Sequence, residues 1–228
     1  MGFTIGGIRD IRSVRRGRSF DGTTVAEYTG LWGWDVRPGA RLVRGECSCG
    51  LAGCLSPGDH PLADAPAVPA GSTLDAATAA WARTPGASVL LPVGRSFDVL
   101  DVDARAGRRA LVRLERMGLP LGPVSVTPAP GPELPGAAPG GRAYFFVAPG
   151  AAARLPQLLY RTGWDYADLD LRCLGPGDHI PAPPSDYRGL GPVRWLRPPT
   201  LDAFSPPALP QARLLLGTLA YVSHRAGI

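Results

Sequence analysis

Two short apolar runs, at residues 87–93 and 97–103, constrain the fold most. Each is rich in β-branched and aliphatic residues and too short for an ordinary helix, so each predicts a buried strand. Further strand patterns occur at 35–43, 122–128, 142–148, 166–173, 177–185 and 192–199, the last two as a strand and its return. Helical patterns occur at 22–33, 72–84, 105–118, 151–163 and 209–225. Strands and helices do not alternate regularly, which favours an α+β fold with an antiparallel or mixed sheet.

The 228 residues suffice for one large domain with short additions. We expect a basic flexible arm at 1–20, a main domain at 21–205, and a terminal helix within 206–228. A Cys-, Gly- and Pro-rich loop at 45–62 is expected to be inserted in the main domain.

The charge balance leaves a nucleic-acid partner open without establishing one. The net charge is +5, and all 24 basic residues are arginine, whose planar fork suits phosphate groups. No apolar run is long enough to cross a membrane, and residues 1–20 lack the apolar centre of a secretory signal. Together with the small number of cysteines, this predicts a cytoplasmic protein that does not contact membranes.

Two pairs of carboxylates are predicted to converge. Asp101 and Asp103 alternate with apolar residues and should project from one face of their strand, and Asp168 and Asp170 repeat this pattern later. Oxygen ligands from two strands are how proteins hold Mg²⁺ or Mn²⁺, and such ions can stabilise the attacking and leaving oxygens of phosphoryl transfer. The alternative is that each strand simply ends in solvated acids, because an Asp-x-Asp pair is a weak motif.

The loop at 45–62 carries a candidate zinc site in the stretch "ECSCGLAGCLSPGDHP". Cys47, Cys49, Cys54 and His60 supply three thiolates and one imidazole, which would close a tetrahedral structural Zn²⁺ site. The alternative is a loop of free thiols. Cys173 lies apart from this loop and is expected to be a core residue.

The order of landmarks along the chain resembles a known family. A "GW" helix end, the "PGDHP" loop, "AAWARTPGASVLLPVG", "VLDVD", "GGRAYFF", "LDLR", and "APPS" before "RWL" follow one another. This series is similar to the N-terminal primase–polymerase domain of bifunctional DNA primase/polymerases, in the archaeo-eukaryotic primase superfamily, and especially to its short actinobacterial members. The resemblance covers roughly residues 22–200.

The resemblance implies an RRM-like sheet flanked by helices and template-directed nucleotidyl transfer in DNA primer synthesis and replication. It implies that Asp101, Asp103 and Asp170 are the catalytic residues and the ligands of Mg²⁺ or Mn²⁺. It also supports the zinc loop, because related proteins carry a similar one. The implied partners are nucleoside triphosphates, single-stranded or primer–template DNA, and a separate helicase.

One position departs from the family pattern. The family places a phosphate-contacting His after "GGR", where this chain has Ala143. We therefore expect weakened nucleotide binding, with Arg142 and His179 as the remaining nucleotide-binding candidates. Two alternative functions stay open: a non-catalytic nucleic-acid-binding replication module with the same fold, and a metal-dependent nuclease.

Overall fold

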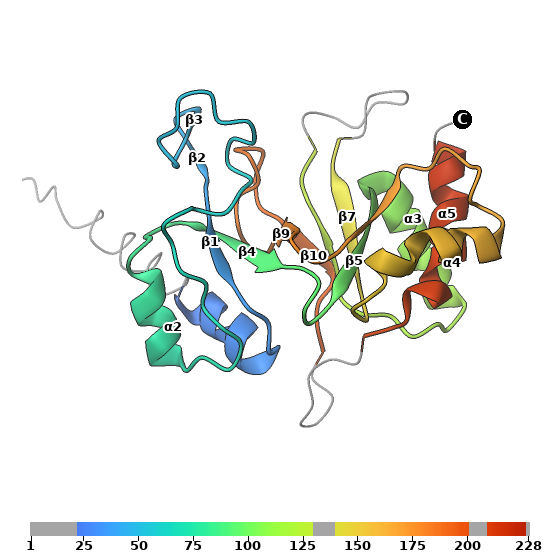
Figure 1. The fold of residues 1–228 in the computed structure, drawn as a ribbon, viewed down its shortest axis with the longest axis horizontal. Helices are drawn as coiled ribbons and strands as arrows, with labels where there is room; N and C mark the ends of the chain where they lie inside the picture. Colours follow the sequence, from blue (N-terminus) through green and yellow to red (C-terminus); the bar gives the residue numbers. More distant parts are fainter. Residues whose placement is uncertain (1–21, 130–139, 201–208, 227–228) are drawn as a thin grey trace, which may run out of the picture.

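The structure is a computed structural model, and it describes residues 22–129, 140–200 and 209–226. The basic arm expected at 1–20 lies outside the described residues, as does most of the Pro/Gly-rich loop that precedes Gly140. The described residues form two units, each with its own sheet and helices, joined through the middle of the molecule (Figure 1).

The N-terminal unit contains a small antiparallel sheet and two helical segments. Residues 22–26 are helical and continue into a π-helical turn, η1 (Glu27–Leu31). Helix α2 (Leu74–Trp81) begins after Thr73, whose hydroxyl accepts a hydrogen bond from the Ala76 amide. The sheet has the order β1-β4-β9, and a separate hairpin pairs β2 with β3. These strands are β1 (Arg37–Gly39), β2 (Leu42–Val43), β3 (Glu46–Cys47), β4 (Ser88–Pro92) and β9 (His179–Pro181).

The second unit is built on a five-stranded antiparallel sheet with the order β10-β6-β7-β5-β8. Its strands are β5 (Asp98–Asp103), β6 (Val124–Val126), β7 (Arg142–Val147), β8 (Leu171–Leu174) and β10 (Arg194–Arg197). Strand β5 is central and pairs with both β7 and β8. Residues directly opposite each other in these pairs share a face of the sheet, so the register decides which side chains meet.

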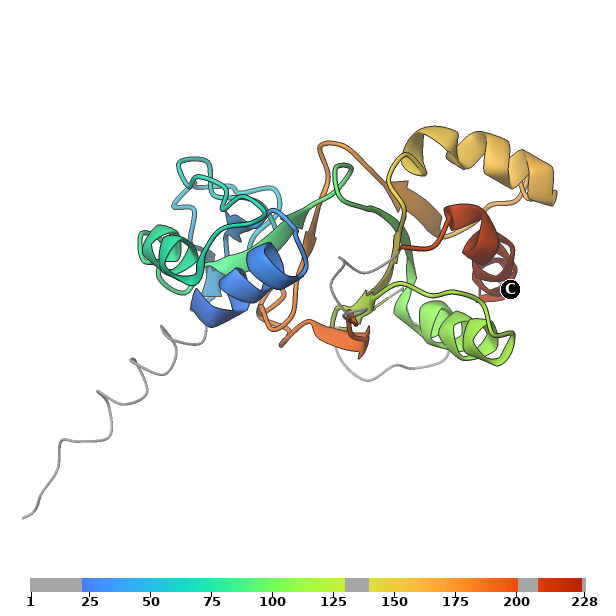
Figure 2. The ribbon, with the colours of Figure 1, turned by 90° about the horizontal axis from the view of Figure 1, so that it is seen from below.

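Helices cover one face of this sheet (Figure 2). They are α3 (Ala104–Arg116), the 3₁₀ turn η2 (Ala152–Arg154) that leads into α4 (Leu155–Thr162), and α5 (Ala212–Ala226). Leu100, Val102 and Phe145 point towards them and are fully buried with leucines of α3 and α5. The opposite face meets the N-terminal unit through Val99, Phe146 and the neighbouring side chains of its aromatic core.

The predicted fold class is confirmed, with two local differences. The segments expected at 177–185 and 192–199 as a strand and its return meet only at their inner ends, where the Val193 amide donates to the Ser185 carbonyl at 2.9 Å, because β9 joins the small sheet and β10 joins the large one. Strand β8 begins at Leu171, so Asp168 and Asp170 precede it rather than forming part of it. In the part of the chain that the structure describes, no helix has the length and apolar character needed to cross a membrane.

Candidate functional site

An arginine joins the two predicted groups of acids. Arg142 Nε donates to Asp101 Oδ1 at 2.6 Å, and Arg142 Nη1 lies 2.7 Å from both carboxylate oxygens of Asp170. The second oxygen of Asp101 accepts from Arg172 Nη2 at 2.6 Å. We call these four residues the acid–arginine network. Asp101 and Asp170 therefore do converge, but the guanidinium of Arg142 lies between them.

Strand register explains why these side chains meet. Asp101 lies directly opposite Arg172 on β8, and Arg142 lies opposite Asp103 at the end of the β5–β7 pair. Asp101, Arg142 and Arg172 therefore project from the face of the sheet that the helices do not cover. Asp170, directly before β8, meets them through its contact with Arg142. Arg172 was not among the residues predicted for the site, although it stands two residues after Asp170 in the "LDLR" motif.

The network is buried unevenly, which sets its electrostatics. The Asp101 side chain is 1% exposed and that of Arg142 16%, whereas those of Asp170 and Arg172 are 44% and 65% exposed. Burial raises the pKa of Asp101, and the hydrogen bonds from Arg142 and Arg172 oppose that rise. Two carboxylates and two guanidinium groups leave the network without net charge.

Asp103 takes a different role. Its Oδ1 accepts hydrogen bonds from the backbone amides of Arg105 and Ala106, both at 2.9 Å, and so it caps the N-terminus of α3. Among the described residues, Asp101, Asp103 and Asp170 do not lie close enough together to form a three-carboxylate group. Their predicted role as shared ligands stays a prediction.

The position expected to carry the family histidine faces away from the acids. Ala143 lies opposite Val102 and is fully buried under α3. A Cβ placed on Gly107 of that helix would clash with the Ala143 Cβ, so helix and sheet are packed as closely as the small residues allow. This register directs residue 142, and not residue 143, to the face of the sheet that carries the acids. The expected role of Arg142 in nucleotide binding stays a prediction.

His179 belongs to the other unit. It lies on β9 opposite Pro92, and burial, together with the nearby charge of Arg37, lowers its pKa. No hydrogen bond within the described ranges joins His179 to the acid–arginine network. Its predicted contact with nucleotide is untested.

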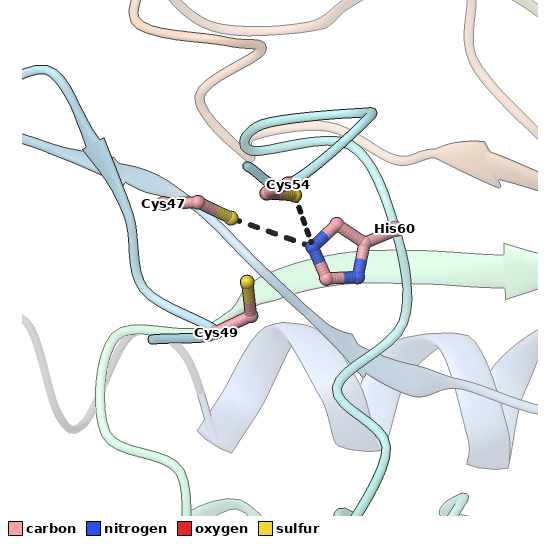
Figure 3. A group of neighbouring side chains, drawn as sticks. All are labelled: Cys47, Cys49, Cys54 and His60. Carbon is pink, nitrogen blue, oxygen red and sulfur yellow. Dashed lines mark hydrogen bonds between the residues drawn. The ribbon is translucent and has the colours of Figure 1, made fainter. Parts of the chain in front are cut away.

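The Cys/His loop brings its four predicted ligands together (Figure 3). The ligand atoms of Cys47, Cys49, Cys54 and His60 all lie within 4.8 Å of one another. His60 Nε2 lies 3.4 Å from Cys47 Sγ and 3.3 Å from Cys54 Sγ. Three thiols and an imidazole converging on one point fit a tetrahedral Zn²⁺ ion.

Contacts around the cluster hold the His60 ring and the Cys47 thiol in position. His60 Nδ1 lies 2.9 Å from the Pro61 carbonyl, which leaves Nε2 to face the cysteines, and the Gly58 amide donates to Cys47 Sγ at 3.4 Å. Hydrogen bonds from neighbouring groups outweigh partial burial and lower the pKa of Cys47 to about 6, which favours the thiolate. Cys173 packs with the core on the helix-covered face, where burial raises its pKa to about 12.

The loop also makes contacts that the sequence did not predict. Asp59, next to His60, pairs with Arg188 at 2.7 Å and 3.1 Å. Burial and the Asp59 carboxylate raise the pKa of Tyr187 to about 12. Asp59 and Asp101 both contribute to the raised pKa of the buried Tyr144, so the loop and the network lie within electrostatic reach of each other.

Comparison with known proteins agrees with these landmarks. Residues 25–212 match the family described as "Bifunctional DNA primase/polymerase, N-terminal". No curated protein and no solved structure matches the chain. The matched region contains the acid–arginine network, the Cys/His loop and both sheets, and it covers most of the 228 residues. The chain therefore belongs to the N-terminal domain family of bifunctional DNA primase/polymerases.

Proposed function

We propose that this protein binds DNA and nucleoside triphosphates and performs metal-dependent nucleotidyl transfer, as in primer synthesis or extension during DNA replication. The observation that carries the proposal is the convergence of Asp101 and Asp170, which lie far apart in the sequence, on the face of the sheet opposite the helices. Family membership supports the reaction class.

The carboxylates of Asp101 and Asp170 suit a hard cation, but the Arg142 guanidinium occupies the space between them. Carboxylate oxygens are the ligands that Mg²⁺ and Mn²⁺ prefer. Asp101 and Asp170 would hold such an ion once the Arg142 guanidinium moves aside, with Asp103 joining them only if it releases the α3 amides. A bound ion would stabilise the negative charge that develops when a primer 3′-hydroxyl attacks the α-phosphate of a nucleoside triphosphate and pyrophosphate leaves.

Arg142 has a role in both arrangements. While it lies between Asp101 and Asp170, it neutralises two carboxylates that would otherwise repel each other. When it is released, it stands on the acid-facing side of β7 with donors that match phosphate oxygens. It would then make a contact with the triphosphate in place of the family histidine that this chain lacks.

Primer extension tests the proposal. The wild-type protein should extend a labelled primer on a template with Mn²⁺ and deoxynucleotides, and Asp101→Asn should abolish extension. Arg83→Gln is the control, because Arg83 is exposed in the N-terminal unit and away from the network. Failure of the wild-type protein to extend primers over a range of Mn²⁺ concentrations would contradict nucleotidyl transfer.

A second candidate is a non-catalytic nucleic-acid-binding module of replication. It is favoured by the neutralised Asp101 and by Asp103, whose carboxylate is already used by α3. This function predicts a DNA mobility shift with no product at any metal concentration, and an unchanged shift in Asp101→Asn.

We also propose that the Cys/His loop holds a structural zinc. A further proposal is that the protein acts in the cytoplasm together with a separate helicase. The four converging ligand atoms support the zinc. Co-purification with a helicase of the same cell would test the partner.

A further inference from the structure

A basic surface lies on the side of the large sheet opposite the acid–arginine network. Helix α3 carries five arginines within 13 residues. Four of them are exposed, and so is Arg225 of α5. Helices α3 and α5 lie side by side (Figure 2). We define the arginine face as Arg108, Arg109, Arg113, Arg116, Arg225 and the intervening Tyr221.

Tyr221 holds two of these guanidinium groups together. The Arg113 guanidinium lies 5.0 Å from the centre of the Tyr221 ring, and that of Arg225 lies 5.8 Å from it. Arg225 Nη1 also donates to the Tyr221 hydroxyl at 3.0 Å, and this hydrogen bond lowers the pKa of Tyr221. The ring therefore fixes two like charges near one another at the surface.

Within the described parts of the chain, no acid pairs with these charges. Glu115 is the only acidic residue in α3 and α5, and its partner is Arg197, at 3.7 Å. Among the described residues, no ion pair involves any arginine of the arginine face. Cations held close without a carboxylate favour a bound polyanion.

The spacing along α3 suits a phosphate backbone. Arg109, Arg113 and Arg116 follow at intervals of four and three residues, so they lie along one side of the helix over about 10 Å. A DNA strand carries one charge per about 3.4 Å of axis, so this row would span about three phosphates. Only Val112 and Met117 add large exposed apolar groups here, too few for a membrane-bound helix.

From this arrangement we infer that the arginine face binds the sugar–phosphate backbone of DNA, as a contact separate from the acid–arginine network. The contact is independent of sequence, because guanidinium groups on phosphates read no bases. It goes beyond the proposed reaction: it would hold template whether or not the network transfers nucleotides.

Fluorescence anisotropy with a short labelled duplex and the matching single strand tests this inference. It uses the zinc-loaded protein without added divalent metal, between about 50 and 200 mM salt. Arg113→Gln/Arg225→Gln should weaken binding by roughly 10-fold or more and make the log–log salt dependence shallower by about two. Arg83→Gln/Arg161→Gln removes two exposed arginines elsewhere and should change neither quantity. Circular dichroism checks that both variants stay folded.

Unchanged affinity and salt dependence in Arg113→Gln/Arg225→Gln would overturn the inference. So would loss of binding to phosphatidylserine vesicles with DNA binding intact, which would assign the face to lipid. Asp101→Asn separates this result from the proposed reaction. Suppose that the wild type and Asp101→Asn both fail to extend primers, and that only Arg113→Gln/Arg225→Gln loses DNA affinity. This result would support DNA binding by the arginine face and contradict nucleotidyl transfer.

Discussion

Arg142 Nε lies 2.6 Å from Asp101 Oδ1, and this contact places a fixed positive charge where the family fold would be expected to admit a metal ion. It explains how a carboxylate on β5 and another directly before β8 can lie close together, because Arg142 also contacts Asp170. Because Asp101 is almost fully buried, the pair should matter for stability as well as for chemistry.

Arg142→Ala should lower the free energy of unfolding by about 3 kcal/mol, because it leaves the buried Asp101 carboxylate with a single exposed partner. Arg172→Ala is the matched control: it removes the exposed partner of the same carboxylate, and should cost less than about 1 kcal/mol. Urea unfolding of both variants measures the difference. Equal losses would show that Arg142 does not carry the main ion pair.

Histidine should be accepted at position 142 and rejected at position 143. Ala143→His forces a polar ring into the contact between β7 and Gly107, at a cost of about 1–3 kcal/mol or more. Arg142→His places the ring on the acid-facing side, where an imidazole N–H can still donate to Asp101, so it should cost less stability than Arg142→Ala and keep part of the nucleotide affinity. Thermal unfolding and nucleotide titration compare them. Tighter nucleotide binding by a stable Ala143→His protein would mean that the strand register is different.

Purified protein should contain about one equivalent of zinc, and its removal should lower the melting temperature. Cys54→Ser should lose the zinc, whereas Cys173→Ala removes a cysteine outside the cluster and should keep it. Elemental analysis of protein prepared under reducing conditions without chelators checks both. An unchanged zinc content in Cys54→Ser would show that the Cys/His cluster does not bind the zinc.

Because of His179, the free energy of unfolding should decrease at acidic pH. Burial and Arg37 lower its pKa in the folded protein below the usual 6.5, so the unfolded chain binds the proton more readily. Stability is therefore lost as the pH falls through about 6.5, and His179→Gln should reduce this loss. Urea unfolding at pH 7 and pH 5 tests it; an equal pH dependence in the two proteins would contradict it.

Much of the fold was accessible from the sequence, because apolar runs and helix caps are local. The two buried strands, the helix that follows Asp103 and the Cys/His cluster were all predicted from spacing. The register was not accessible: whether Arg142 or Ala143 faces the acids depends on a pairing with β5, some 40 residues away, and a shift of one residue reverses it.

Long-range polar contacts were missed for the same reason. The capping role of Asp103 competes with metal binding in a way that the Asp-x-Asp pattern alone does not reveal. The pair between Asp59 and Arg188 joins residues 129 positions apart, and no local motif marks it. The division of β9 and β10 between two sheets likewise follows from packing rather than from the short strand patterns themselves.

The Mn²⁺ affinity of zinc-loaded protein shows whether Arg142 closes a metal site, and calorimetry measures it for the wild type, Arg142→Gln and Arg142→Gln/Asp101→Asn. If Arg142 closes a metal site formed by Asp101 and Asp170, then Arg142→Gln should bind Mn²⁺ about 10-fold more tightly than the wild type, because a charge-assisted contact no longer competes. The double variant should lose this binding. Equal Mn²⁺ affinity in all three proteins would contradict the central claim.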